Sequence, residues 1–318
     1  MGMSHQWRRV YICGGSVVEV SGDCFPRVQD YLESFYDNIH HADDRIDWRV
    51  NLCRTAETLP AGHLEVVTNR WGVGAALNQE LRTIHIVAQN YDDACAATRH
   101  AVRTGWLLGW EARGAVALHA SSFLYAGRIV VLAGDKNHGK TTLALSAVAE
   151  WGGALISNDH LLCTLSTTGV DMVGLPTLIP VKPYTAARLA HVLPKPIESS
   201  PARDRHYFAF RQFDSVRLPV DIGSHPTVLV YPHFSKEGRI ELMPFCKSKD
   251  ELRSHARDDW FDLVARGVGV LPKEVRTTDD YRASTEAVVD RLANSCTSLR
   301  FAHTGDVTPL LAWLEANV

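Results

Sequence analysis

The first 112 residues contain several short runs in which apolar and polar side chains alternate. Such alternation predicts half-buried strands, because successive side chains of a strand point to opposite faces of the sheet. The expected strands lie at residues 10–12, 17–20, 48–54, 63–69 and 81–88. Gly14-Gly15 and Trp71-Gly72-Val73-Gly74 predict turns between successive strands.

A helical pattern is clearest at residues 92–112, where Trp106 and Trp110 lie one turn apart. Asp92 is the expected cap at the start of this helix, and Arg113-Gly114 is its expected end. The tryptophan pair is interpreted as core packing.

Residues 27–41 show a weaker helical pattern that ends at His40-His41. Adjacent side chains on a helix point about 100° apart, so we interpret these histidines as surface residues and not as ligands of one metal ion. Residues 1–112 are therefore predicted to form a small α+β region without evident chemistry.

Strands and helices alternate from residue 113 to residue 318. The expected strands lie at 114–122, 128–133, 154–160, 160–166, 207–211, 227–231, 239–243 and 297–302, and the expected helices at 143–151, 280–293 and 307–316. This order favours an α/β domain, and its sheet should be mixed because several connections are as short as hairpins.

Residues 193–206 are predicted to form a mobile loop. They contain three prolines and two serines, and Arg203 and Arg205 lie near their end. We expect this segment to act as a lid on the acceptor side of the site, because lids are drawn from weakly packed loops.

Composition excludes several classes of function. The chain has 318 residues, 46% of them hydrophobic, and a net charge of −3 with no basic block, so it can bury a sizeable core and is not expected to bind nucleic acid. Its apolar runs are too short for a membrane span and its start has no apolar signal core. Seven scattered cysteines without a C-x-x-C pair favour reduced thiols in the cytoplasm.

The most informative stretch is Gly134-Asp135-Lys136-Asn137-His138-Gly139-Lys140-Thr141-Thr142, which fits the phosphate-binding pattern G-x-x-x-x-G-K-[ST]. A predicted strand precedes it and a predicted helix follows it. In such a loop the backbone N–H groups and the helix N-terminus attract phosphate oxygens. Lys140 would contact the β- and γ-phosphates, and the Thr141 hydroxyl would bind Mg²⁺.

Two further residues flank this loop at the ends of predicted strands. His119 precedes Lys140 by 21 residues, and Asn158-Asp159 follows a short apolar strand, with Asp159 19 residues after Lys140. Asp171 lies shortly before Gly174-Leu175.

Together these residues resemble the catalytic domain of HPr kinase/phosphorylase and the wider HPr kinase-like enzymes. The resemblance covers roughly residues 117–176 and implies a P-loop kinase domain of the HPr kinase/PEP carboxykinase-like type at 113–318. It implies ATP and Mg²⁺ as cofactors, a role for His119 near the γ-phosphate or in orienting Asp159, and Asp171 as a second metal ligand.

The sequence departs from that family at several points. Asn158 stands in place of the first acid of a pair, and Thr141 stands where the family has serine. No segment matches the family's later arginine-bearing motif, and residues 1–110 do not resemble its amino-terminal domain. HPr itself is therefore not the expected acceptor.

Asp159 is the expected general base, because an acceptor hydroxyl must lose its proton as the phosphoryl group transfers. Holding Mg²⁺ is its alternative role. Arg203, Arg205 and Arg211 are candidates for neutralising charge on the transferring group.

The leading hypothesis is an ATP- and Mg²⁺-dependent kinase that acts on a serine or threonine of a peptide or protein. A kinase for a small hydroxyl compound and a nucleotide-hydrolysing switch are the alternatives. The absence of an N-K-x-D motif speaks against a GTPase. Assembly into a homo-oligomer stays open.

Overall fold

A computed structural model describes residues 7–38, 45–56, 59, 67–68, 72–257, 260–270 and 276–317. The chain divides into two compact units, Met1–Arg113 with Asp259–Thr278, and Gly114–Asp258 with Asp279–Val318. The expected division placed residues 259–278 in the second part, whereas here they cluster with the first. His40-His41 lies outside the described residues.

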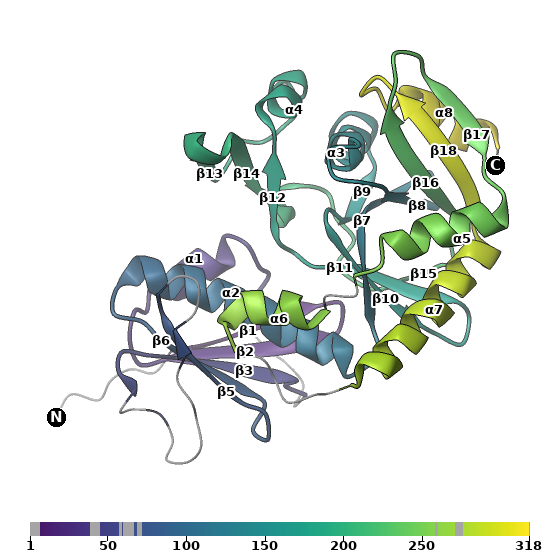
Figure 1. The fold of residues 1–318 in the computed structure, drawn as a ribbon. Helices are drawn as coiled ribbons and strands as arrows, with labels where there is room; N and C mark the ends of the chain where they lie inside the picture. Colours follow the sequence, from purple (N-terminus) through teal and green to yellow (C-terminus); the bar gives the residue numbers. More distant parts are fainter. Residues whose placement is uncertain are drawn as a thin grey trace. The chain divides into compact units, whose positions relative to one another are not determined.

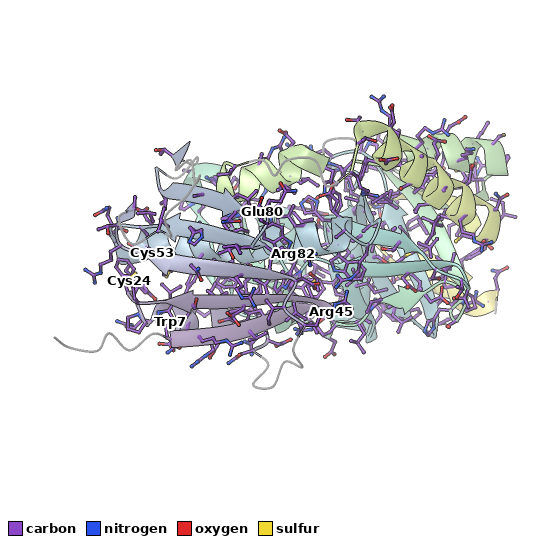
Figure 2. All side chains as sticks on the ribbon, turned by 90° about the horizontal axis from the view of Figure 1, so that it is seen from below. Trp7, Cys24, Arg45, Cys53, Glu80 and Arg82 are labelled. Carbon is purple, nitrogen blue, oxygen red and sulfur yellow. The ribbon has the colours of Figure 1, made fainter. Side chains whose placement is uncertain are left out.

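The first unit is built on a six-stranded mixed sheet with the order β1-β2-β3-β6-β5-β4. Its elements are β1 (Trp7–Cys13), β2 (Ser16–Gly22), α1 (Val28–Glu33), β3 (Trp48–Cys53), β4 (Val67–Thr68), β5 (Gly74–Asn78), β6 (Thr83–Val87), α2 (Tyr91–Glu111) and α6 (Trp260–Val268). Helix α2 packs on β2, β3 and β6, and α6 packs on α2 (Figure 1). Figure 2 shows the sheet from below, with Trp7, Cys24 and Cys53 toward one end of the strands and Arg45 and Arg82 toward the other.

Helix α2 begins one residue before its expected start. Its cap is Asn90, whose side chain accepts a hydrogen bond from the Asp93 N–H at 3.0 Å, so the expected cap Asp92 lies inside the first turn instead. Trp106 and Trp110 are buried, and the Trp110 indole donates to the Cys13 carbonyl at 3.0 Å. Their predicted role in core packing is confirmed.

The second unit contains a nine-stranded mixed sheet, which confirms the predicted mixed α/β class. Its order is β15-β11-β10-β7-β8-β16-β18-β17, with β9 paired to β7. The elements of this sheet and its helices are β7 (Val116–Tyr125), β8 (Arg128–Ala133), α3 (Lys140–Trp151), β9 (Ala154–Ser157), β10 (His160–Leu165), β11 (Val170–Gly174), α4 (Pro183–Arg188), β15 (Val220–Asp221), β16 (Thr227–Phe234), β17 (Arg239–Leu242), α5 (Phe245–Ser254), α7 (Thr278–Ser295), β18 (Thr297–His303) and α8 (Thr308–Ala316).

Only β8, β16 and β18 run parallel within this sheet, and their carboxyl ends therefore meet at one edge. The core is formed by apolar side chains of α3, α8 and these strands, including Leu143, Leu145, Val230, Phe301 and Leu311. In α/β sheets, ligands bind outside the carboxyl ends of parallel strands. This edge carries the candidate site.

The proline-rich segment at 193–206 is not the loop that its composition predicted. It contains β13 (Glu198–Ser200), which pairs with β14 (Arg205–Ala209) in a three-stranded sheet completed by β12 (Leu178–Val181). The prolines lie outside the three residues of β13, where they remove no hydrogen-bond donor from the ladder. A three-residue strand is too short to show periodicity in the sequence.

Among the helices of the described ranges, none combines the length and apolar character of a membrane span.

Candidate active site

The predicted strand, loop and helix around Gly134 are present. The loop leaves the end of β8 and enters α3 at Lys140. Asn137 and Gly139 both have positive φ, 73° and 86°. Consecutive turns of this kind curl the backbone, and the N–H groups of the first turn of α3 have no partner within the helix. This arrangement suits an anion.

Lys140 folds back over the loop instead of extending into solvent. Its Nζ donates to the carbonyls of Gly134 at 2.6 Å and Asp135 at 3.0 Å, and the residue is only 7% exposed. Burial lowers the pKa of Lys140, while the charges of Asp159 and Asp135 oppose this shift. The ammonium group is thus held close to the loop and close to an acid.

Two contacts join the loop to α4, which sequence analysis did not predict. Lys182, directly before α4, donates from Nζ to Asn137 Oδ1 at 2.7 Å. The hydroxyls of Thr142 and Thr185 lie 2.8 Å apart. These bonds bring a second cation to the side of the loop opposite Asp159's strand ends.

Asp159 lies between two histidines. His119 Nε2 is 3.0 Å from Asp159 Oδ1, and His160 Nε2 is 3.3 Å from Asp159 Oδ2. Burial would raise the pKa of Asp159, but the hydrogen bond from His119 and the positive charges of the two histidines and Arg257 outweigh it and hold this pKa below its usual range. The carboxylate therefore stays ionised at neutral pH, and 45% of its side chain remains exposed.

The pairing of β7 with β10 explains this cluster. His119 and His160 are directly opposite each other in the antiparallel register, so their side chains share one face of the sheet. The His255 carbonyl accepts a hydrogen bond from the His119 N–H at 2.8 Å and fixes the strand end. Asp159 directly precedes β10 and reaches both rings.

Asn158 offers an unpaired polar atom at the same place. The residue is 5% exposed, and its Oδ1 has no hydrogen-bond partner among the described residues. Its backbone carbonyl accepts from Ser121 Oγ at 2.7 Å, which holds the turn. Buried polar atoms without partners are rare, so this oxygen is a candidate ligand atom.

A cavity of about 500 Å³ connects these groups. It lies entirely within the second unit and is lined by His119, Lys136, Asn137, Gly139, Lys140, Thr141, Thr142, Asn158, Asp159, Pro180, Lys182, Tyr184, Thr185, Arg205 and Phe234. Its volume is in the range of small-molecule sites. Gly134, Asp135 and His138 belong to the loop but not to the wall of the cavity.

Asp171 does not join the other predicted metal ligands, and its expected role is wrong for a site shared with Asp159. It pairs with Thr164 near the far end of β10, four residues along the strand from His160. At about 3.4 Å per residue, that places it on the order of 13 Å away. Burial and the charge of Asp221 raise the pKa of Asp171.

The three candidate arginines separate in the structure. Arg205 lines the cavity, whereas Arg203 and Arg211 are exposed and do not line it. Lys182, Tyr184 and Phe234 also line the cavity but were not predicted. None belongs to a local motif, because β12, α4 and β16 bring them to the loop only through the tertiary fold.

Gly139 carries a steric prediction. A Cβ there would lie 2.5 Å from Cε1 of His303, whereas a Cβ at Gly152, which has a similar φ of 71°, would meet nothing within 4 Å. Gly152→Ala should cost about 1–2 kcal/mol through its backbone alone. Gly139→Ala should cost about 1–3 kcal/mol more through overpacking. Urea denaturation of both variants measures the difference, and equal losses would contradict the contact.

No protein-family model matches the chain, and no curated protein matches it. Within the described ranges, no group of three or more His, Cys, Asp and Glu side chains is placed to hold a metal ion.

Proposed function

We propose that the protein is an ATP- and Mg²⁺-dependent kinase that transfers the γ-phosphoryl group to a hydroxyl. One observation carries this proposal: a single cavity contains both the loop of the phosphate-binding pattern and an ionised carboxylate held by two histidines. Phosphoryl transfer requires positioning and charge stabilisation more than covalent chemistry by the protein.

The loop end of the cavity suits the phosphates. Lys140, Lys136 and Lys182 bring three cations to it, and Thr141 begins α3, where the helix dipole is positive. Phe234 and Tyr184 are 51% and 66% exposed on its wall. Exposed aromatic rings beside a phosphate site provide flat surfaces on which a nucleobase can stack.

The oxygen atoms present fit Mg²⁺, which binds one or two protein oxygens together with water and substrate phosphates. Thr141 Oγ1, Asn158 Oδ1 and the Asp159 carboxylate would hold it, and the unpartnered Asn158 oxygen is the observation that supports this set. When bound, Mg²⁺ neutralises charge that develops on the phosphate oxygens.

Asp159 is then placed to accept the proton of the acceptor hydroxyl. His119 and His160 each contact one of its two oxygens and restrict its rotation. Each carboxylate oxygen has a further lone pair, so the carboxylate can still receive a proton from a hydroxyl in the cavity. The acceptor is a peptide or protein serine or threonine, with a small hydroxyl compound as the alternative.

Arg205 is the arginine we assign to the transferring group. Arg205→Gln should lower the transfer rate about 10- to 100-fold, because a hydrogen bond to a charged group contributes about 1.5–3 kcal/mol. Arg203→Gln is the matched control, since Arg203 is exposed in the same segment and does not line the cavity. Steady-state rates with saturating acceptor measure both, and similar rates for the two variants would contradict the assignment.

Incubation with γ-labelled ATP, Mg²⁺ and a cell extract tests the proposed function. Label on a protein or small hydroxyl compound supports a kinase and identifies the class of acceptor. Release of free phosphate alone would instead support the nucleotide-hydrolysing switch. Absence of both would overturn the proposal.

A further inference from the structure

We propose that His303 is a positioning residue that sets the direction of the backbone N–H of Gly139 in the phosphate loop. This inference rests on the proposed function of that loop. His303 is the last residue of β18, 165 residues after His138, and no sequence pattern connects the two.

Both ring nitrogens of His303 have backbone partners. Nδ1 accepts from the Gly305 N–H at 2.9 Å, so the proton of the neutral ring lies on Nε2. Nε2 is 2.9 Å from the carbonyl oxygen of His138 and donates to it. The ring therefore holds one loop carbonyl through a bond whose direction is fixed.

The peptide between His138 and Gly139 transmits this contact. Because a peptide bond is planar and trans, its C=O and N–H point in opposite directions. A His138 carbonyl bound to His303 thus forces the Gly139 N–H to point away from His303. Gly139 lines the cavity, and its N–H is a donor for a phosphate oxygen in the proposed complex.

The ring itself is held tightly. His303 is 1% exposed, and its ring lies 4.5 Å from that of Phe234 and 5.4 Å from that of Phe301. Gly139 packs directly against it, so only a residue without a side chain allows this approach. Burial lowers the pKa of His303, as do the nearby charges of His233, His138 and Arg188, while the bond to His138 opposes the shift.

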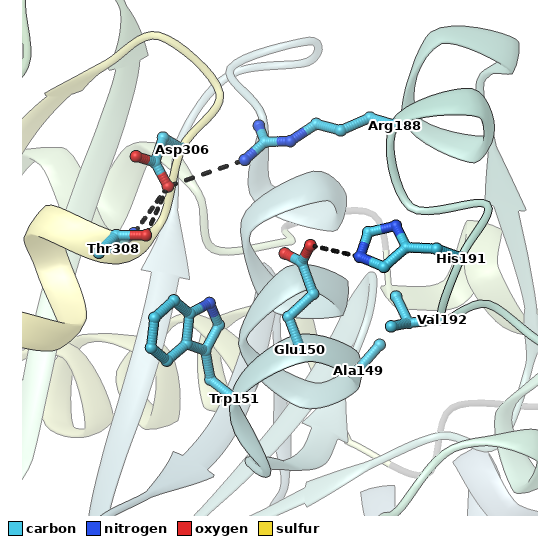
Figure 3. A pocket seen from close by; sticks show the side chains of 8 residues that line it. All are labelled: Ala149, Glu150, Trp151, Arg188, His191, Val192, Asp306 and Thr308. Carbon is cyan, nitrogen blue, oxygen red and sulfur yellow. Dashed lines mark hydrogen bonds and ion pairs between the residues drawn. The ribbon is translucent and has the colours of Figure 1, made fainter.

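Arg188 extends this arrangement to a second, smaller cavity of about 280 Å³ (Figure 3). Its guanidinium donates to the Gly305 carbonyl and lies 3.8 Å from Asp306 Oδ1. Gly305, with φ of 101°, is the residue whose N–H holds His303 Nδ1. The Gly305 turn is therefore fixed on both sides.

Two substitutions separate the bonds of His303. Glutamine can reach the His138 carbonyl with its amide N–H, whereas asparagine is too short to reach it but retains an acceptor for the Gly305 N–H. Amide hydrogen exchange of the intact protein without nucleotide provides the readout. His303→Asn should accelerate exchange across residues 134–143 roughly 3- to 10-fold, the worth of one hydrogen bond, and His303→Gln should restore slow exchange.

The outcomes are distinct. Equal acceleration in both variants, or none in either, would overturn the inference, because a merely structural ring does not distinguish the two amides. Exchange in β7 and β16 serves as the control for global destabilisation. Titration with a non-hydrolysable ATP analogue separates this inference from the proposed function. If wild type binds no analogue but the exchange pattern holds, the proposed function fails and the positioning role stands.

Discussion

Lys140→Met is expected to reduce phosphoryl transfer by about 10²–10³, the usual effect of removing one donor that faces developing charge. Lys140 is the buried cation of the loop, and no other loop ammonium lies against the carbonyls of Gly134 and Asp135 in the described structure. Methionine retains an unbranched side chain of similar length, so the space beneath the loop stays filled.

The structure changes how this experiment should be designed. The sequence indicated that a loop lysine packs against little, but Lys140 is almost fully buried. Lys140→Ala would therefore combine loss of charge with loss of packing. Lys136→Met is the matched control, because Lys136 is exposed on the same loop and should lose only a few-fold in rate. Near-normal transfer by Lys140→Met would remove the phosphate-loop assignment.

Asp159→Asn is expected to lower transfer by about 10²–10⁴, the contribution of general-base catalysis. The substitution is nearly isosteric and keeps an oxygen for one of the two histidines. If Asp159 acts chiefly as the base, the affinity for Mg²⁺ with a non-hydrolysable ATP analogue should change little. If Asp159 chiefly holds Mg²⁺, that affinity should fall together with the rate. Calorimetric titration set beside the transfer rate distinguishes the two roles.

Asp171→Asn is the matched control for this variant, because it removes the same charge from the far end of β10. We expect wild-type transfer from it, and full activity in Asp159→Asn would exclude that carboxylate from the mechanism.

The lowered pKa of Asp159 adds an expectation on pH. An aspartate that is depressed in the folded state stabilises the fold above its unfolded pKa of about 3.9, and this stabilisation is lost as pH falls through the lower folded value. No loss of activity between pH 8 and 5 should therefore come from this carboxyl.

The parts of the site that the sequence predicted are those with local signals. The phosphate loop is nine consecutive residues, and both His119 and Asp159 lie at strand ends within about 20 residues of it. The hairpin-like pairing of β7 with β10 then brings the two side chains together. Asp171 failed because the β10–β11 hairpin carries the chain back along β10, away from Asp159.

The unpredicted parts depend on long-range pairing. Phe234 and His303 reach the loop because β16 and β18 lie parallel to β8 and end at the same edge. Register between strands more than 90 residues apart leaves no local pattern. Helices α4, α5 and α6 and strand β5 are also short, and β5 begins where Gly72 and Gly74 predicted a turn. The α6 segment pairs with α2 through contacts such as Arg103 with the Leu263 carbonyl, at 3.2 Å, which composition does not reveal.

The most direct test of the central claim is a calorimetric titration of the intact protein with a non-hydrolysable ATP analogue in Mg²⁺, compared with Lys140→Met. The account predicts one site in the wild type, competition by inorganic tripolyphosphate, and affinity at least about tenfold weaker in Lys140→Met, equivalent to about 1.4 kcal/mol. Absence of binding by the wild type, or equal affinity in the two proteins, would contradict a nucleoside triphosphate site at Gly134–Thr142.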